Sequence, residues 1–233
     1  MRVLLFSILL PVSVDAGAWA RGEGQTYAAL GIEAAEAGIA ATLFAERGMS
    51  EKITIGLDGF VDEENESLTA TAFARYTFDT KGPNVWAVSV GLGGEYRVDE
   101  RLLQLTAGGP IFTADHRRAG GFLRLGGHYG RGLENGWFAA DASYALGRLK
   151  SQDDPPLPDE DIARAKIDIT YGRRFSEPIT AIGQLFLEDY DGDDAASVQV
   201  GVTYDFSEVT MGAALRQGSD GDTVLTIGAS RRF

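Results

Sequence analysis

The chain has 233 residues, a formal net charge of −13 at pH 7 and no cysteine. The acidic balance argues against nucleic-acid binding, because phosphate backbones select basic surfaces. The lack of cysteine excludes disulfide frameworks and cysteine-ligated metal centres. No stretch reaches the roughly 20 apolar residues that a bilayer-spanning helix needs.

The first residues, MRVLLFSILLPVSVDAGAWA, have the pattern of a secretory signal peptide. Arg2 supplies a positive charge, residues 3–14 are apolar, and Ala16 and Ala18 are small residues at which a signal peptidase would cut. A buried N-terminal strand or helix is the alternative interpretation. We predict a leader over residues 1–16 and a single domain over residues 17–233.

From residue 24 onward, apolar and polar residues alternate with period two, which predicts strands with one apolar and one polar face. We expect twelve strands, at residues 24–34, 38–47, 51–61, 67–78, 84–97, 119–131, 136–149, 162–175, 178–188, 195–206, 208–217 and 222–233. An even number places both ends of a barrel chain on the same side. Segment 98–118 has the pattern of a further hairpin or a long loop, and we expect it at the opposite mouth, where it could fold over or into the barrel.

A soluble β-sandwich alternates in the same way, so further features are needed. Many apolar faces end in an aromatic residue, among them Tyr76, Phe78, Trp137 and Tyr204, as in the aromatic girdles of membrane barrels. Ionisable residues occupy the middle of the polar faces, which line the lumen in such barrels. The connections alternate between short ones and long or acidic ones, such as 151–161 and 188–194. We therefore predict an all-β fold, a single antiparallel up-and-down transmembrane β-barrel of about 12 strands.

These features resemble the Gram-negative outer-membrane β-barrels. The segments AERGMSEKITIGLDGF and LRLGGHYGRGLENGWFAADASYALG resemble an uncharacterised porin-like family of proteobacterial envelopes. The resemblance implies a location in the cell outer membrane and contact with lipid and lipopolysaccharide. It also implies that the barrel-assembly machinery recognises the last strand, LTIGASRRF, through Leu225, Ile227, Ala229 and Phe233. The family brings no known reaction with it.

The residues predicted to face the lumen carry both signs of charge. They define the candidate constriction, which comprises Asp58, Arg75, Glu95, Arg124, His128, Asp141, Arg164, Lys166, Asp168, Arg174, Asp205 and Arg216. The predicted function is a narrow porin-like channel for passive diffusion of small solutes, with weak charge selectivity because the signs balance. The alternative is a closed structural or surface-interaction barrel whose acidic outer loops bind divalent cations.

A hydrolase and a calcium-binding loop are two further possible functions. A lipid or lipopolysaccharide hydrolase would use His128 with Asp141 and Ser143, but the sequence lacks the Asn-His motif of barrel lipases. Asp189, Asp191 and Asp193 form only a loose match to a calcium loop, because Gly192 is not at the sixth position. We therefore expect no enzyme activity, no cofactor and no resident metal.

Overall fold

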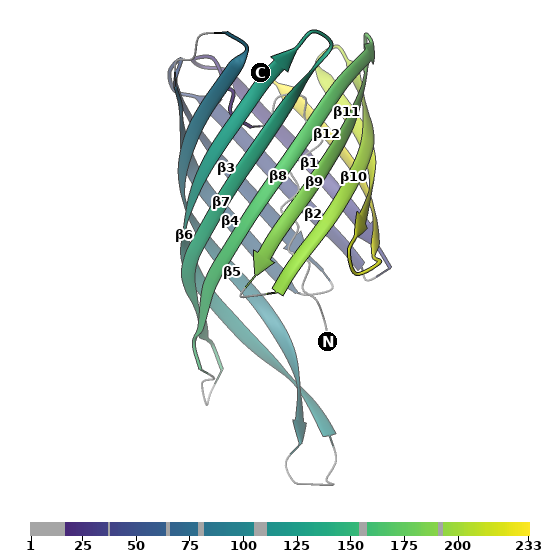
Figure 1. The fold of residues 1–233 in the computed structure, drawn as a ribbon. Helices are drawn as coiled ribbons and strands as arrows, with labels where there is room; N and C mark the ends of the chain where they lie inside the picture. The colour runs from purple at the N-terminus through teal and green to yellow at the C-terminus, as the bar shows by residue number, and fades with distance from the viewer. Residues whose placement is uncertain are drawn as a thin grey trace.

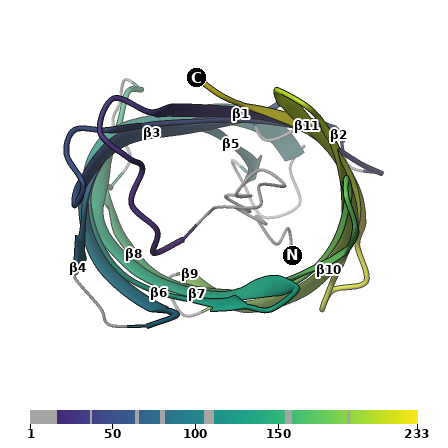
Figure 2. The ribbon, with the colours of Figure 1, turned by 90° about the horizontal axis from the view of Figure 1, so that it is seen from above.

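The computed structural model describes residues 17–36, 38–63, 66–78, 82–104, 111–153, 158–190 and 193–233, without the side chains of residues 99–104, 111–115 and 193. Twelve antiparallel strands close into one barrel, in which β1 pairs with both β2 and β12 (Figures 1 and 2). The strands are β1 (Thr26–Ala35), β2 (Gly38–Gly48), β3 (Ile53–Asp62), β4 (Ser67–Phe78), β5 (Asn84–Gln104), β6 (Ile111–Leu133), β7 (Gly136–Ser151), β8 (Glu160–Ser176), β9 (Ile179–Tyr190), β10 (Asp193–Phe206), β11 (Val209–Gly218) and β12 (Thr223–Arg232).

The predicted fold is confirmed, and most predicted strand ends lie within three residues of the observed ones. Closure joins the first strand to the last, because the N–H of Thr26 donates to the carbonyl of Phe233 and the N–H of Phe233 donates to the carbonyl of Thr26. We call this end of the barrel the terminal end. The opposite end is called the far end. The described residues contain no helix long and apolar enough to cross a membrane.

The described residues of segment 98–118 lie at the far end, as expected, but they form paired strands and do not fold over or into the barrel. Strand β5 continues to Gln104 and β6 begins at Ile111, and the two strands remain paired up to Gln104 and Ile111. They leave the barrel wall as a two-stranded ribbon that reaches beyond the far end (Figure 1). Continued pairing satisfies the backbone groups of this segment without a fold over or into the lumen.

The acidic segment 188–194, which the sequence suggested as a loop, is also mostly strand. Strand β9 ends at Tyr190 and β10 begins at Asp193, so only residues 191–192 connect them. The short connections 134–135, 177–178 and 207–208 lie at the terminal end, as the alternation of the loops predicts.

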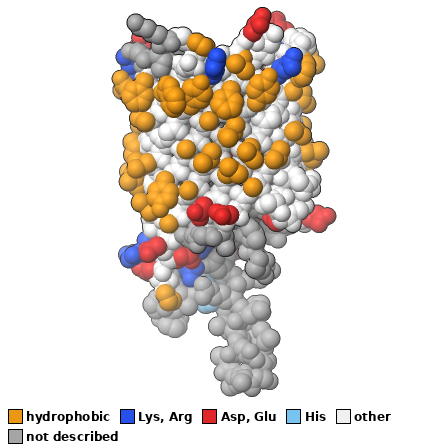
Figure 3. All heavy atoms as spheres, viewed as in Figure 1, with side chains coloured by type: hydrophobic (Ala, Val, Ile, Leu, Met, Phe, Trp, Pro, Cys, Tyr) orange, Lys and Arg blue, Asp and Glu red, His pale blue; other side chains and the backbone are white. Residues whose placement is uncertain are grey.

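The outer surface is apolar. Along β12, Leu225 and Ile227 are exposed while Thr226 and Ser230 are buried on the inner face. Apolar side chains form a belt around the visible face of the barrel, and a row of large ones lies near the terminal end (Figure 3). Such a surface would be unstable in water, because large contiguous apolar patches mark contact with a partner or a membrane.

Trp137 does not belong to this outer belt, contrary to the prediction. Its side chain is buried inside the barrel in a cluster with Ala139 and Ile182. The ring takes the space above Gly172, where any Cβ would overlap the indole. The absence of a side chain at Gly172 therefore lets a large aromatic group turn inward.

Residues 17–25, which precede β1, enter the barrel from the rim, where residues 23–25 are exposed, and are called the inserted segment. Figure 2 shows the chain turning from the rim at β1 into the interior. Ala18 is completely buried, and its carbonyl accepts a hydrogen bond from Thr77 Oγ1 at 3.1 Å. The side chain of Trp19 packs against the cluster of Trp137, Ala139 and Ile182.

Candidate functional site

The candidate site is the lumen, where inward-facing side chains from non-adjacent strands meet. Period-two alternation determines which residues of each strand point inward. Barrel closure then brings those residues together across the interior. The contacts fall into three groups along the lumen, one near the far end, one in the middle and one near the terminal end.

Near the far end, the lumen is crossed by Arg164 of β8 and Glu95 of β5. The guanidinium donates to both carboxylate oxygens of Glu95, at 2.6 and 2.9 Å. It also lies 4.1 Å from the ring centroid of Tyr190, a cation–π contact. Arg97 donates to the hydroxyl of Tyr190 at 2.6 Å and pairs with Glu160. Two arginines and two acids from β5 and β8 therefore join around one tyrosine of β9.

In the middle, charged pairs join both neighbouring and distant strands. Arg124 of β6 pairs with Asp58 of β3. Lys166 Nζ lies 3.3 Å from Asp168 and 3.2 Å from Glu188. The side chains of Asp58 and Arg124 are 12% and 18% exposed, so water reaches this level of the lumen.

The middle of the lumen also contains a relay of three polar side chains. Ser89 Oγ lies 2.8 Å from His128 Nε2, and His128 Nδ1 lies 2.6 Å from Asp141 Oδ1. These residues line a cavity of about 100 Å³, which we call the middle cavity and which Ser143 and Gly17 also border. The serine that contacts His128 is therefore Ser89, not Ser143 as the sequence suggested.

Near the terminal end, Glu46 of β2 lies between two arginines. Arg21 of the inserted segment donates to Glu46 Oε1 at 3.0 Å, and Arg75 of β4 pairs with Oε2. The side chain of Glu46 is completely buried, and those of Arg21 and Arg75 are 8% and 5% exposed. A buried carboxylate is tolerated here because its charge is paired and hydrogen-bonded. We call these three residues the terminal cluster.

Backbone groups of the inserted segment hold it in place. Arg75 donates to the carbonyl of Trp19 at 3.2 Å, and the N–H of Arg21 donates to Thr54 Oγ1 at 3.2 Å. The segment therefore contacts β3 and β4 through hydrogen bonds. It contacts β7 and β9 through Trp19, whose partners Trp137 and Ile182 belong to those strands. It crosses the lumen from one wall to the other.

Most of the predicted lumen residues face the interior, and two of them lie close to the rim of the terminal end. Arg216 lies inside and donates to Glu33 at 2.9 Å. Arg174 is exposed at the terminal end of β8, beside an irregularity in its pairing with β9. Asp205 lies near the terminal end of β10, where it accepts from Thr210. Asp205 shares the inner face of β10 with Gln199 and Thr203, whereas Arg174 is exposed, and the constriction itself stays a prediction.

Sequence reasoning missed several lumen residues. Alternation along 38–47 places Thr42, Phe44 and Glu46 on one face, so the signal for Glu46 was present. The same holds for Ser89 on the inner face of β5. Trp19 and Arg21 precede the first strand and carry no periodic signal.

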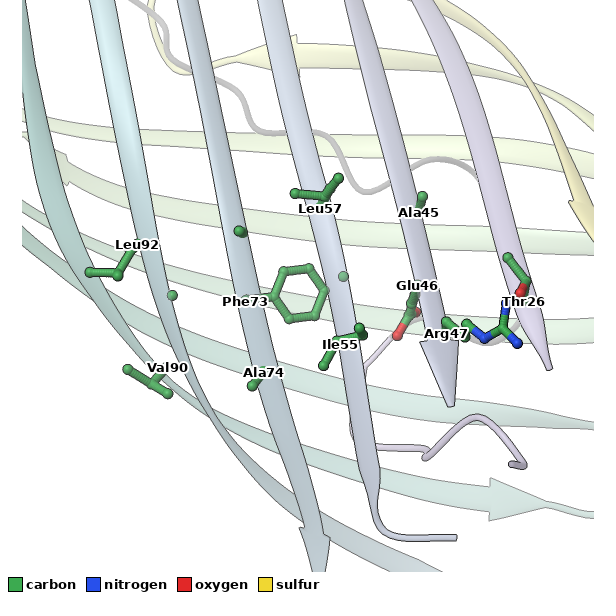
Figure 4. A pocket seen from close by; sticks show the side chains of 13 residues that line it. Thr26, Ala45, Glu46, Arg47, Ile55, Leu57, Phe73, Ala74, Val90 and Leu92 are labelled. Carbon is green, nitrogen blue, oxygen red and sulfur yellow. The ribbon is translucent and has the colours of Figure 1, made fainter. Parts of the chain in front are cut away.

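A hollow of about 610 Å³ lies on the outside of the described barrel, across β2 to β5. Figure 4 shows Ile55, Leu57, Val90 and Leu92 around it, with Ala74 between Ile55 and Val90 and Ala45 beside Leu57. The groove forms because small residues interrupt a row of large ones. Its apolar lining makes it part of the outer belt.

The weak metal candidates gain no support. Among the residues that the structure describes, no group of acidic or histidine side chains has the arrangement of a metal site. Asp189 is exposed at the far end of β9. Asp191 and the predicted leader, residues 1–16, lie outside the described residues, as does the side chain of Asp193.

A closed twelve-stranded up-and-down barrel with an apolar exterior and an ionised interior has the fold of the Gram-negative outer-membrane β-barrels. Solved structures of that class are similar to the chain. The β domain of the Bordetella autotransporter BrkA is 15% identical, with a TM-score of 0.58 over 93% of this chain and 99% of that one. The translocator domain of NalP from Neisseria meningitidis is 14% identical, with a TM-score of 0.59 over 91% and 90%. The KdgM porin is 10% identical, with a TM-score of 0.55 over 89% and 99%.

No protein-family model matches the chain, and no curated protein matches it either. At these identities the structural similarity establishes the fold. The chemistry must be argued from the lumen itself.

Proposed function

We propose that the protein spans the outer membrane of a Gram-negative envelope and acts as a narrow porin-like channel for small solutes. One observation supports this function above the others: a closed barrel has lipid-compatible side chains outside and a partly solvated, charged lumen inside. Porins and hydrocarbon channels share the fold. The terminal end would face the periplasm, because outer-membrane barrels have short periplasmic turns.

The channel is narrow because its own side chains cross it. The pairs Arg164–Glu95 and Arg124–Asp58 join strands that are not neighbours in the barrel wall. Each pair neutralises itself, so no single sign of charge dominates the described lumen contacts. We expect weak selectivity between small anions and cations.

The inserted segment narrows the periplasmic end further. It is fixed by the Arg21–Glu46 pair, by hydrogen bonds to Arg75 and Thr77, and by the packing of Trp19. The wild-type protein should therefore show a small conductance. Release of the inserted segment should enlarge it.

Planar-bilayer recording with the refolded mature chain tests the channel. We expect small, discrete current steps with nearly equal permeability for potassium and chloride. If neither the wild type nor a variant with a released inserted segment conducts, the channel function is wrong. The closed structural barrel would then remain as the function, since its lumen pairs would serve stability alone.

The last strand is proposed to carry the signal for the barrel-assembly machinery, with Leu225, Ile227, Ala229 and Phe233 facing lipid. Deletion of Phe233 should sharply reduce the amount of folded barrel in the outer membrane, because the terminal ring and two backbone hydrogen bonds to Thr26 are lost. Heat-modifiable migration on a gel measures the folded fraction.

Phe175→Ala is the matched control for this deletion. Phe175 is similarly exposed, at 67% against 65% for Phe233, but it lies inside the chain. The control variant should assemble normally. Equal assembly of the Phe233 deletion and the wild type would contradict the proposed signal.

A further inference from the structure

The relay of Ser89, His128 and Asp141 has the order of groups that acyl transfer requires. A serine hydroxyl contacts one imidazole nitrogen at 2.8 Å, and a carboxylate contacts the other at 2.6 Å. In this arrangement the carboxylate orients the imidazole, and the imidazole removes the proton of the hydroxyl. The three residues come from three adjacent strands, β5, β6 and β7.

Strand register explains how the relay forms. His128 and Asp141 are direct partners across β6 and β7, which places the carboxylate beside the ring. Ser89 pairs with Gly126, two residues before His128. A Cβ at Gly126 would overlap Ser89 Oγ and would lie 3.0 Å from His128 Nε2. The glycine thus leaves open the space in which the serine and the imidazole meet.

The relay borders the middle cavity and is not sealed. The side chains of His128 and Asp141 are 16% and 15% exposed, so water reaches them. Phe44 and Phe73 provide an apolar wall, and their rings stack with centroids 5.9 Å apart. Arg124 and Lys166 line the same cavity and are ion-paired there with Asp58 and Asp168. Each of these side chains carries several N–H donors, so it can also stabilise the negative charge that develops on a reacting carbonyl oxygen beside its acidic partner.

We propose that Ser89, His128 and Asp141 form an esterase site in the lumen, which hydrolyses small soluble esters with a short acyl chain. The cavity of about 100 Å³ limits the acyl group to a few carbon atoms. The acyl chains of membrane lipids lie on the other side of the barrel wall. The substrate is therefore a solute of the channel, which distinguishes this site from a lipid hydrolase.

The reaction balances with water as the second substrate. Ser89 Oγ attacks the ester carbonyl carbon while its proton passes to His128 Nε2. The carbon–oxygen bond to the alcohol then breaks, and the alcohol leaves with that proton. Water attacks the acyl-serine and gives a proton to His128, which returns it to Ser89 as the carboxylic acid departs. Asp141 contacts no substrate and is a positioning residue.

Covalent labelling of the refolded mature barrel with diisopropyl fluorophosphate tests the nucleophile. Intact-mass and peptide analysis should find one adduct, on Ser89, and the Ser89→Ala variant should lose it. Ser197→Ala is the matched control, since Ser197 is an inward serine on β10 outside the cavity, and it should label as the wild type does. No adduct on the wild type, or an adduct on Ser143, overturns the proposal.

Hydrolysis of p-nitrophenyl acetate tests the positioning role. Asp141→Asn should lower the rate on the order of 10⁴-fold, the loss that an imidazole in the wrong tautomer causes in a serine protease. Asp141→Glu should recover part of the rate, because it restores a carboxylate that can orient the imidazole. An Asp141→Asn rate equal to that of the wild type overturns the proposal. Neither experiment depends on whether the barrel conducts.

Discussion

The terminal cluster and the middle cavity are built from the same kinds of side chain, but their charged groups differ in exposure to solvent. In the terminal cluster, the Glu46 carboxylate has no exposure and is held by Arg21 and Arg75. In the middle cavity, Asp58 and Arg124 keep access to solvent. The difference comes from the inserted segment, which covers the first group and only borders the second. Charges that the segment covers must stay paired, whereas polar groups that border the cavity can also contact a solute.

Release of the inserted segment should have the largest effect of the predicted changes, and the affected quantity is the single-channel conductance. The double variant Trp19→Ala/Arg21→Ala removes both its aromatic contact with Trp137 and its ion pair with Glu46. Single-channel conductance should increase severalfold. The matched control Trp86→Ala/Arg131→Ala removes the same side chains from positions exposed in the structure and should leave conductance unchanged. Unchanged conductance in the first variant would show that the inserted segment does not limit the current.

Removal of one carboxylate from each region should lower the free energy of unfolding by different amounts. Glu46→Gln leaves two buried arginines without their shared acid and should lower the free energy of unfolding by about 3–5 kcal/mol. Asp58→Asn breaks a solvated pair and should cost about 1 kcal/mol. Urea unfolding of the refolded barrel in lipid measures both. Equal losses would mean that the inserted segment does not shield the terminal cluster.

A cysteine cross-link should locate the inserted segment and have the smallest effect on conductance and stability, with some backbone strain because the φ of Gly17 is +106°. A Cβ at Gly17 would lie 3.3 Å from the Cβ of Ala139, close to the separation of about 3.8 Å in a disulfide. Because the chain has no cysteine, Gly17→Cys/Ala139→Cys offers one intramolecular pair. Oxidation should form the bond, detected by intact mass. In the control pair with Ala140→Cys, the second thiol points to the other face of β7, and no bond should form.

The barrel itself could be predicted because a strand repeats every two residues. In β12 the alternation of Leu225, Thr226 and Ile227 gives both the strand and its two faces. The even number of strands and the alternation of short and long loops then indicate that the strands close into a barrel. The sequence left segment 98–118 undecided between a hairpin and a loop, because paired strands that have left the barrel wall no longer need one apolar face.

The sequence by itself determined which residues point inward, and this placed His128, Asp141 and Arg124 in the lumen. It did not determine which of them meet, because contacts such as Arg124–Asp58 and Arg164–Glu95 depend on closure and on the tilt of distant strands. The choice of Ser89 over Ser143 depended on the space at Gly126. Only the tertiary structure showed that Trp19 and Arg21 enter the barrel, since a segment without periodicity is positioned by the surfaces it contacts.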